Sequence, residues 1–294
     1  MRFSSFKLAI GISVLSVVGS MGSTAMAAGF TADSLNGPSL VYSESGGLTS
    51  LDPNGDYQSA LDGQGNVELG GQTTSSSVAD FDNATVLTGS FADGTQATFS
   101  SLTRSDWFGT DGVTSYGEND LANQWFGGLL SDGGLGARLA QFNIMASAFS
   151  MPTYSESDVF GAFTAMGGFQ RFSDPNIDSV SQNGNDLTIE LAGHMDAAYP
   201  VSQFAPELAN FFRGIQISEV LRVDYDGATQ YLYSFAGDAS GVMSDDQTFS
   251  HTGTFKVTAE GSDEVADVPE PATALGLLLV GIAGLGSARK TLAA

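Results

Sequence analysis

The stretch that decides the fold class is IDSVSQNGNDLTIEL, residues 177–191. Apolar and polar residues alternate along it, and side chains of a β-strand point alternately to its two faces. Its centre, Asn183-Gly184-Asn185, is turn chemistry, because glycine adopts positive φ without a steric penalty. The stretch therefore predicts an antiparallel β-hairpin.

The same period of two recurs on both sides of this hairpin. A second hairpin is predicted around the Asp226-Gly227 turn, and the strand after it is predicted to close the sheet. Short β-branched or aromatic patches predict further strands upstream. The ranges of these strands are 67–69, 84–86, 97–102, 220–225, 229–235 and 249–257. Residues 51–56 and 61–66 resemble each other and are predicted to form turns.

The middle of the chain has the longer period of a helix. Leu121, Trp125 and Leu129 follow a Ser115-x-x-Glu118 capping box. A second apolar stripe predicts a helix whose apolar face joins the core, with a binding groove as the less favoured alternative. That stripe comprises Leu135, Leu139, Phe142, Met145, Ala146 and Phe149. Two more helices are predicted at residues 157–166 and 206–213.

These periods together predict an α+β fold, with an antiparallel β-sheet or sandwich and a helical insertion at about residues 116–170. The alternative is two domains divided near residue 115. The 294-residue chain contains no cysteine, so the fold depends on packing rather than on disulfides.

The region between the two ends is strongly acidic. Residues 28–268 hold 32 of the 33 acidic residues and 6 of the 10 basic residues, which gives a formal charge of −26. Such a charge opposes binding to nucleic acid and to anionic membrane surfaces. We expect an acidic body without a nucleic-acid partner.

The sequence offers few candidates for a chemical site. The two histidines, His194 and His251, are expected to be structural or solvated, and the sequence lacks the zinc-peptidase and α/β-hydrolase signatures. Asp52, Asn54 and Asp56 resemble the first half of a calcium loop, but Tyr57 and Gly63 stand at the EF-hand positions for glycine and glutamate. These three are weak candidates for Ca²⁺, and otherwise we expect neither a cofactor nor a catalytic residue.

The N-terminal residues have the pattern of an export signal. Arg2 and Lys7 precede an apolar stretch, and Ala25-Met26-Ala27 matches the A-x-A pattern of a signal-peptidase site. We therefore predict a signal peptide at residues 1–27, export by the Sec machinery and cleavage after Ala27.

The C-terminal residues have the pattern of a membrane anchor. Pro269-Glu270-Pro271 precedes residues 272–288, which contain no charged residue, and Arg289-Lys290 follow. This run is near the lower limit of the about 17–25 residues that span a bilayer as a helix. The basic pair favours a cytoplasmic C-terminus. We predict an exported body at residues 28–262, a linker at 263–268 and a single inner-membrane span at 272–288.

Residues 269–294 resemble the PEP-CTERM sorting signal of Gram-negative bacteria, through the Pro-Glu-Pro motif, the apolar run and the basic pair. The resemblance implies recognition and processing by exosortase, a membrane-embedded cysteine transpeptidase. It also implies a final location in the cell envelope or the extracellular matrix, often near exopolysaccharide. Residues 168–177 and 191–194 resemble a PEP-CTERM subgroup seen in cyanobacteria.

These observations favour a non-enzymatic envelope or matrix protein with a structural or adhesive role near exopolysaccharide. One alternative is a carbohydrate- or calcium-binding module, in which Trp107, Trp125 or exposed tyrosines stack on sugar rings. A less favoured alternative is a polysaccharide hydrolase that uses paired carboxylates.

Overall fold

The computed structural model describes residues 28–70, 80–245 and 250–261. All of them belong to the first of two units into which the chain divides, residues 1–261 and 262–294. The predicted signal peptide, linker and sorting segment, including residues 272–288, lie outside the described residues.

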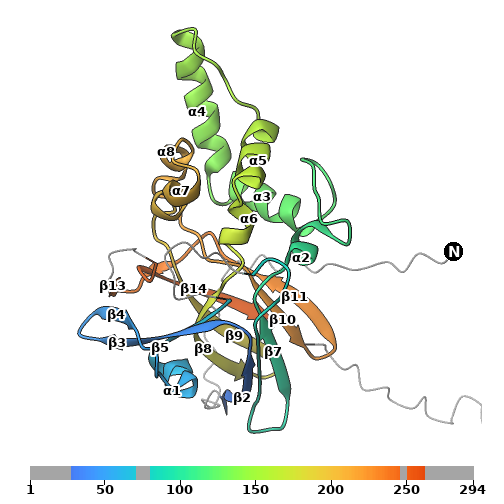
Figure 1. Ribbon diagram of the computed structural model, residues 1–294, viewed down its shortest axis with the longest axis vertical. Coiled ribbons are helices and arrows are strands. Elements are labelled where there is room, and N and C mark those ends of the chain that lie inside the picture. The colour runs from blue at the N-terminus through green and yellow to red at the C-terminus, as the bar shows by residue number, and fades with distance from the viewer. Residues whose placement is uncertain (1–27, 71–79, 246–249, 262–294) are drawn as a thin grey trace, which may run out of the picture. The chain divides into compact units, whose positions relative to one another are not determined.

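Two β-sheets account for the strands of the described chain (Figure 1). In the nine-stranded sheet the order is β12-β14-β9-β8-β5-β3-β4-β13, and β1 pairs with β8. Its strands are β1 (Ala28–Gly29), β3 (Ser39–Ser45), β4 (Leu48–Leu51), β5 (Asp62–Leu69), β8 (Asn176–Asn183), β9 (Asp186–Gly193), β12 (Asp238–Ala239), β13 (Met243–Ser244) and β14 (Gly253–Ala259). Its pairings are antiparallel except that of β13 with β4, which is parallel.

The five-stranded sheet is antiparallel throughout and has the order β11-β10-β7-β6-β2. Its strands are β2 (Thr31–Asn36), β6 (Val86–Ser90), β7 (Gln96–Ser100), β10 (Leu221–Tyr225) and β11 (Ala228–Leu232). Apolar residues of both sheets share one buried cluster, here called the sheet core. It includes Val67, Ile177, Ile189, Leu87, Phe99 and Val223.

Both predicted hairpins are confirmed. Strands β8 and β9 pair around the Asn183-Gly184 turn, and Asn183 faces Asp186 in the register. Strands β10 and β11 pair around Asp226 and Gly227, which have φ values of +49° and +75°. The prediction of an α+β fold is confirmed with them.

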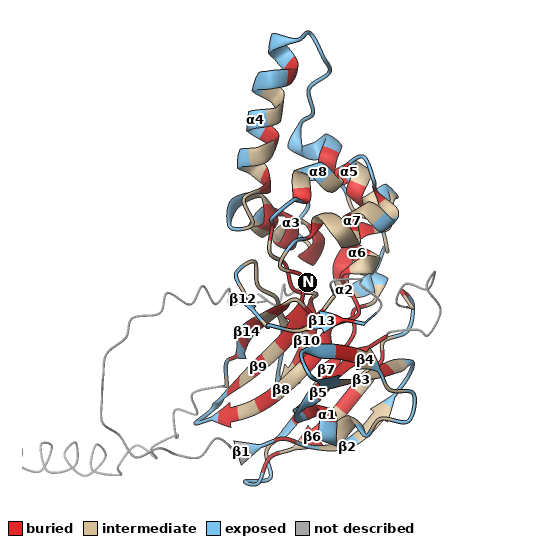
Figure 2. Ribbon diagram, turned by 90° about the vertical axis from the view of Figure 1, so that its left-hand side faces the viewer, coloured by how far each residue is buried: buried red, intermediate tan, exposed pale blue. Residues whose placement is uncertain are grey.

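Seven helices gather beyond one end of the sheets, while α1 (Tyr57–Leu61) packs beside β5 (Figures 1 and 2). Their bounds are α2 (Arg104–Phe108), α3 (Leu121–Ser131), α4 (Leu135–Ala148), α5 (Glu156–Ala165), α6 (Gly168–Arg171), α7 (Ala198–Phe204) and α8 (Ala209–Phe212). Helices α2 to α6 lie between β7 and β8 in the chain, where the sequence predicts a helical insertion.

The helices enclose a second buried cluster, the helical core, which is rich in aromatic rings. Trp125 of α3 lies at its centre, with ring centroids 5.3 Å from Phe172, 5.7 Å from Phe163 and 5.7 Å from Trp107. Aromatic pairs at these separations stabilise a core beyond the area that they bury. Packing of aromatic rings therefore holds the helical part together.

Three local predictions are wrong. Helix α3 is capped by Asp120, whose carboxylate accepts a hydrogen bond from Asn123 N at 2.8 Å, so Ser115-x-x-Glu118 is a turn rather than a capping box. Residues 61–66 end α1 and begin β5, where the sequence predicts a turn, whereas the strand predicted at 67–69 is confirmed as the end of β5. The helix predicted at residues 206–213 is confined to α8, and α7 was not predicted.

The α4 stripe is only partly in the core, against the prediction. Leu135, Leu139 and Ala146 are buried, but Met145 and Phe149 are 55% and 77% exposed. The helix projects beyond its neighbours, so its second half has little protein to cover it (Figure 2).

Candidate functional site

A cleft of about 340 Å³ lies between α4 and α8. Helix α4 lines it with side chains at intervals of three and four residues, and the chain entering and forming α8 does the same from the other side. The lining residues are Arg138, Gln141, Phe142, Met145, Glu207, Asn210 and Phe211. Two short runs of sequence thus present one face each to a shared space.

Aromatic rings line part of this cleft. The rings of Phe142 and Phe211 meet edge to face, with centroids 5.0 Å apart. The Phe142 ring also stacks on Tyr154, at 5.8 Å between centroids. These contacts fix the orientation of the two phenylalanine rings, so the apolar part of the cleft is preformed.

Polar side chains complete the lining. Within the described residues, the side chains of Arg138, Gln141, Glu207 and Asn210 form no hydrogen bond or ion pair with the protein. Together they offer guanidinium and amide donors as well as amide and carboxylate acceptors. A ligand with several hydroxyl groups and an apolar face would satisfy both parts of the lining.

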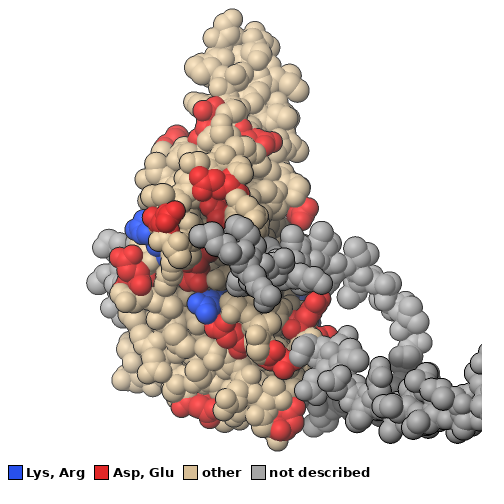
Figure 3. Space-filling view, turned by 90° about the vertical axis from the view of Figure 1, so that its right-hand side faces the viewer, with Lys and Arg blue, Asp and Glu red and all other residues tan. Residues whose placement is uncertain are grey.

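Beyond the cleft, the second half of α4 and the chain that returns from it form an uncharged apolar tip. Its exposed apolar residues are Ile144, Met145, Phe149, Met151 and Tyr154. Asn143 holds the returning chain, because its side chain donates to Tyr154 O at 2.7 Å and accepts from Tyr154 N at 2.9 Å. The sequence has no charged residue between Arg138 and Glu156, and Figure 3 shows carboxylates over the body but not over the projecting end.

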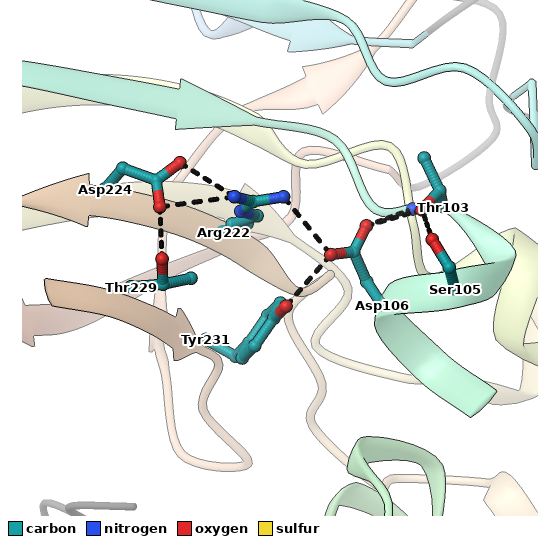
Figure 4. A network of polar contacts seen from close by, with 7 residues as sticks. All are labelled: Thr103, Ser105, Asp106, Arg222, Asp224, Thr229 and Tyr231. Atoms are coloured by element: carbon teal, nitrogen blue, oxygen red, sulfur yellow. Dashed lines mark hydrogen bonds and ion pairs between the residues drawn. The ribbon is translucent and has the colours of Figure 1, made fainter. Parts of the chain in front are cut away.

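A polar network centred on Asp106 joins the helices to the five-stranded sheet (Figure 4). The Asp106 carboxylate accepts a hydrogen bond from Tyr231 at 2.9 Å, pairs with Arg222 at 3.4 Å and caps α2 through Thr103. Arg222 also pairs with Asp224 at 3.1 Å, and the Thr229 hydroxyl donates to Asp224. Burial, followed by the charge of Asp106, raises the pKa of Tyr231. Each of these residues has a partner within the network, so we interpret the network as a structural link between α2 and strands β10 and β11.

Two acids with raised pKa values lie near each other: Asp174 is buried where α6 leads into β8, and Glu219 is half-buried just before β10. Burial raises the pKa of Asp174 to about 7, and burial together with the charge of Asp174 raises the pKa of Glu219 well above its usual value. Asn176 donates to Glu219 at 3.1 Å. The described residues provide no hydrogen-bond partner for Oδ1 of either Asp174 or Asn176. Because the raised pKa values favour the protonated acids in the folded state, these two acids make the free energy of unfolding depend on pH.

Both histidines are buried, and both lie near the end of the β9–β14 pairing at which Gly193 faces Gly253. His194 follows β9, and its backbone exchanges two hydrogen bonds with Ile217. In the His251 ring, Nε2 lies 3.1 Å from Asn66 Oδ1. The other ring nitrogen, Nδ1, lies 3.0 Å from Ser244 Oγ and 2.9 Å from Ser250 Oγ. Since Asn66 Oδ1 accepts, Nε2 carries the proton and Nδ1 accepts from the hydroxyls. The backbone of His194 and the ring of His251 thus each hold neighbouring segments together.

The weak calcium candidates lie just before α1. Asp52 accepts a hydrogen bond from Asn54 N at 3.1 Å, and Asp56 caps α1 by accepting from Ser59 N at 2.8 Å. Across the described residues, no three histidine, aspartate or glutamate side chains form a group that could hold a metal. Calcium binding at Asp52, Asn54 and Asp56 stays a prediction.

The expectation that Trp107 or Trp125 stacks on sugar is wrong. Both indoles are fully buried in the helical core. Sequence reasoning favoured the core over a binding groove for Phe142 and Met145, and it considered none of the polar lining residues, so it did not predict the cleft. The spacing of Arg138, Gln141, Phe142 and Met145 on one helical face is the signal that could have indicated it.

The residues that carry the sorting prediction lie outside the described part of the chain. They are Ala25, Ala27, Pro269, Glu270, Pro271, Arg289 and Lys290. Within the described ranges, no helix has the length and apolar character needed to cross a bilayer.

Comparison with known proteins gives one match. No curated protein and no solved structure matches the chain. The family model of the PEP-CTERM protein-sorting motif matches residues 267–290. That range contains the Pro-Glu-Pro motif, the apolar run and the basic pair, and it supports exosortase-dependent sorting to the envelope, with a membrane-anchored stage before processing. Residues 267–290 thus identify the chain as a protein that carries the PEP-CTERM sorting motif.

Proposed function

We propose that the sorted body is a non-enzymatic adhesive element of the envelope or matrix, and that it binds a neutral polysaccharide in the cleft between α4 and α8. The observation that carries this proposal is the cleft itself. It combines two oriented phenylalanine rings with four polar side chains that have no hydrogen-bond partner among the described residues.

The chemistry of a sugar ring suits this lining. A pyranose has an apolar face of C–H groups, which can pack on Phe142 or Phe211, and an edge of hydroxyl groups. Gln141 and Asn210 can each donate to and accept from those hydroxyls. The volume of about 340 Å³ is near the lower limit of about 300 Å³ for ligand pockets, which suits one or two sugar units of a longer chain.

Charge supports a neutral polymer over a polyuronate. The body carries a formal charge of −26, which repels polyanions. Arg138 is the single basic residue of the cleft lining, and Glu207 offsets it. We therefore expect uncharged hexose polymers to bind better than acidic ones.

The lining also favours binding over hydrolysis. Most glycoside hydrolases place two carboxyl groups on either side of the bond that they cleave. The cleft lining contains a single carboxylate, that of Glu207. This supports an adhesive role rather than a catalytic one.

The test is a binding titration of the purified full chain in detergent with dextran, soluble starch and laminarin, using alginate as the acidic comparison. We expect at least one neutral polymer to bind and Gln141→Ala or Asn210→Ala to weaken binding about tenfold, which corresponds to about 1.4 kcal/mol. Gln203→Ala is the matched control, because Gln203 is an exposed glutamine of α7 outside the cleft. Equal affinity of all three variants and the parent, or binding to none of the polymers, would refute the proposal.

A further inference from the structure

A second cavity, of about 100 Å³, lies at the nine-stranded sheet and shares no lining residue with the cleft. Strands β3, β4, β5 and β8 contribute Glu44, Thr49, Asn66 and Asp178 to its lining, and His251 lies before β14. Since one water occupies about 30 Å³ in the liquid, the space can hold an ion together with a few waters. Unlike the cleft, this cavity is lined mainly by oxygen-bearing side chains.

A distortion of the sheet places Asp178 at this cavity. In the pairing of β8 with β9, Ile177 faces Leu191 and Ser179 faces Glu190, so Asp178 is the extra residue of a β-bulge. The pairing of β8 with β5 is also irregular between Asp62 and Val67, opposite the same point. Bulges redirect side chains and recur next to functional sites. The backbone here departs from regular pairing where a carboxylate meets the cavity.

Two oxygen-bearing side chains of the cavity lining, those of Thr49 and Asp178, lack a donating or positive partner among the described residues. Thr49 is 2% exposed, and its Oγ1 has no hydrogen-bond partner among the described residues. Among the described residues, the Asp178 carboxylate also has no hydrogen-bond donor and no positively charged side chain as a partner. Lys256, the one lysine between residues 28 and 268, pairs instead with Glu190 at 3.2 Å.

The charges that act on Asp178 are those of two other carboxylates, Glu190 and Glu44. Burial, followed by the charges of Glu190 and Glu44, raises the pKa of Asp178 to about 6. An ionised carboxylate near other carboxylates is unfavourable unless a positive charge compensates it. A bound cation would supply that charge and would also give the Thr49 hydroxyl oxygen a partner.

We propose that this cavity binds one hard divalent cation, Ca²⁺ or Mg²⁺, with Asp178 and Glu44 as its carboxylate ligands and Thr49 as a neutral oxygen ligand. Both ions prefer oxygen ligands, and Mg²⁺ in particular retains several waters when one or two carboxylates hold it. Because the described chain has no group of three metal-ligating acids or histidines, the site depends on neutral oxygens and water to complete the shell. His251 acts as a positioning residue, since it holds the side chain of Asn66 at the cavity wall.

This site is separate from the predicted calcium candidates Asp52, Asn54 and Asp56, none of which lines the cavity. That separation supplies a matched control. Asp178→Asn and Glu44→Gln remove a charge from the cavity and nearly preserve side-chain size, while Asp52→Asn makes the same chemical change outside it. Glu44 is exposed, so Glu44→Gln tests the site even if Asp178→Asn perturbs the bulge.

The experiment is calorimetric titration of the full chain, purified in detergent and stripped with EDTA, with CaCl₂ and separately with MgCl₂. We expect one bound ion per chain, at least tenfold weaker binding in Asp178→Asn and Glu44→Gln, and unchanged binding in Asp52→Asn. The titration that saturates at the lower concentration identifies the preferred ion. Binding by neither ion, equal binding by the cavity variants and the parent, or loss confined to Asp52→Asn would each overturn the proposal. None of these outcomes depends on polysaccharide binding.

Discussion

Helices α3 and α4 follow one another in the chain and carry similar apolar periods, yet they have different environments. Helix α3 buries Leu121, Ala122, Trp125, Phe126 and Leu129. Helix α4 buries Leu135, Leu139 and Ala146 and exposes Met145 and Phe149. The period of apolar residues therefore indicates which face of a helix is apolar, but it does not indicate whether protein covers that face. The predictions below test this contrast, from the largest expected effect to the smallest.

The largest effect is expected on the α3 side. Trp125→Ala should lower the free energy of unfolding by about 3–5 kcal/mol, because it leaves a cavity among packed aromatic rings. Urea unfolding followed by the fluorescence of Trp107 measures the change. Trp125→Phe should cost clearly less, since it keeps a ring and removes an indole N–H that has no partner among the described residues. A loss below about 1 kcal/mol for Trp125→Ala would show that the helical core is loosely packed.

An intermediate effect is expected from Asp174 and Glu219, the two acids with raised pKa values beside the helical core. The raised pKa values of Asp174 and Glu219 mean that the folded state binds more protons than the unfolded state above about pH 4. Stability should therefore fall as the pH rises from about 4 through about 7, the raised pKa of Asp174. Asp174→Asn should make this decline shallower and raise stability at pH 8, relative to the parent, by on the order of 1–2 kcal/mol.

Urea unfolding at pH 5 and pH 8 measures this pH dependence. Asp111→Asn is the matched control, because Asp111 is exposed. A parent whose stability rises steadily from pH 4 to pH 8 would contradict the assignment of raised pKa values to the two acids.

The smallest effect is expected at the apolar tip of α4. Phe149→Ser should change the free energy of unfolding by less than about 0.5 kcal/mol, because the side chain is exposed and packs little. Urea unfolding under the conditions used for Trp125→Ala allows a direct comparison. A loss of roughly 2 kcal/mol or more, the cost of truncating a buried residue, would mean that the tip is covered in solution and that α3 and α4 do not differ in this respect.

The parts of the fold that the sequence predicted depend on short-range signals. The hairpins at Asn183-Gly184 and Asp226-Gly227 are set by turn residues and alternating faces, which are local. The pairing of β14 with β9 and the exposure of Phe149 depend on contacts between distant parts of the chain, which periodicity does not encode.

The candidate sites show the same division. The sorting motif is a contiguous signal, so Pro269, Glu270 and Pro271 could be identified directly, and the family model supports them. Gln141 and Asn210 both line the cleft, and Thr49 and Asp178 both line the cavity, although the two residues of each pair are far apart in the sequence. A single sequence does not reveal which of its polar residues converge in this way.

The position of β14 in the larger sheet has a consequence for the timing of export. This strand is the last along the described chain, yet it lies between β9 and β12, so the sheet stays open until residue 259 has emerged. Non-local pairing of this kind slows folding, which suits a chain that crosses a membrane unfolded. The body therefore completes its larger sheet only with its last strand, just before the predicted linker.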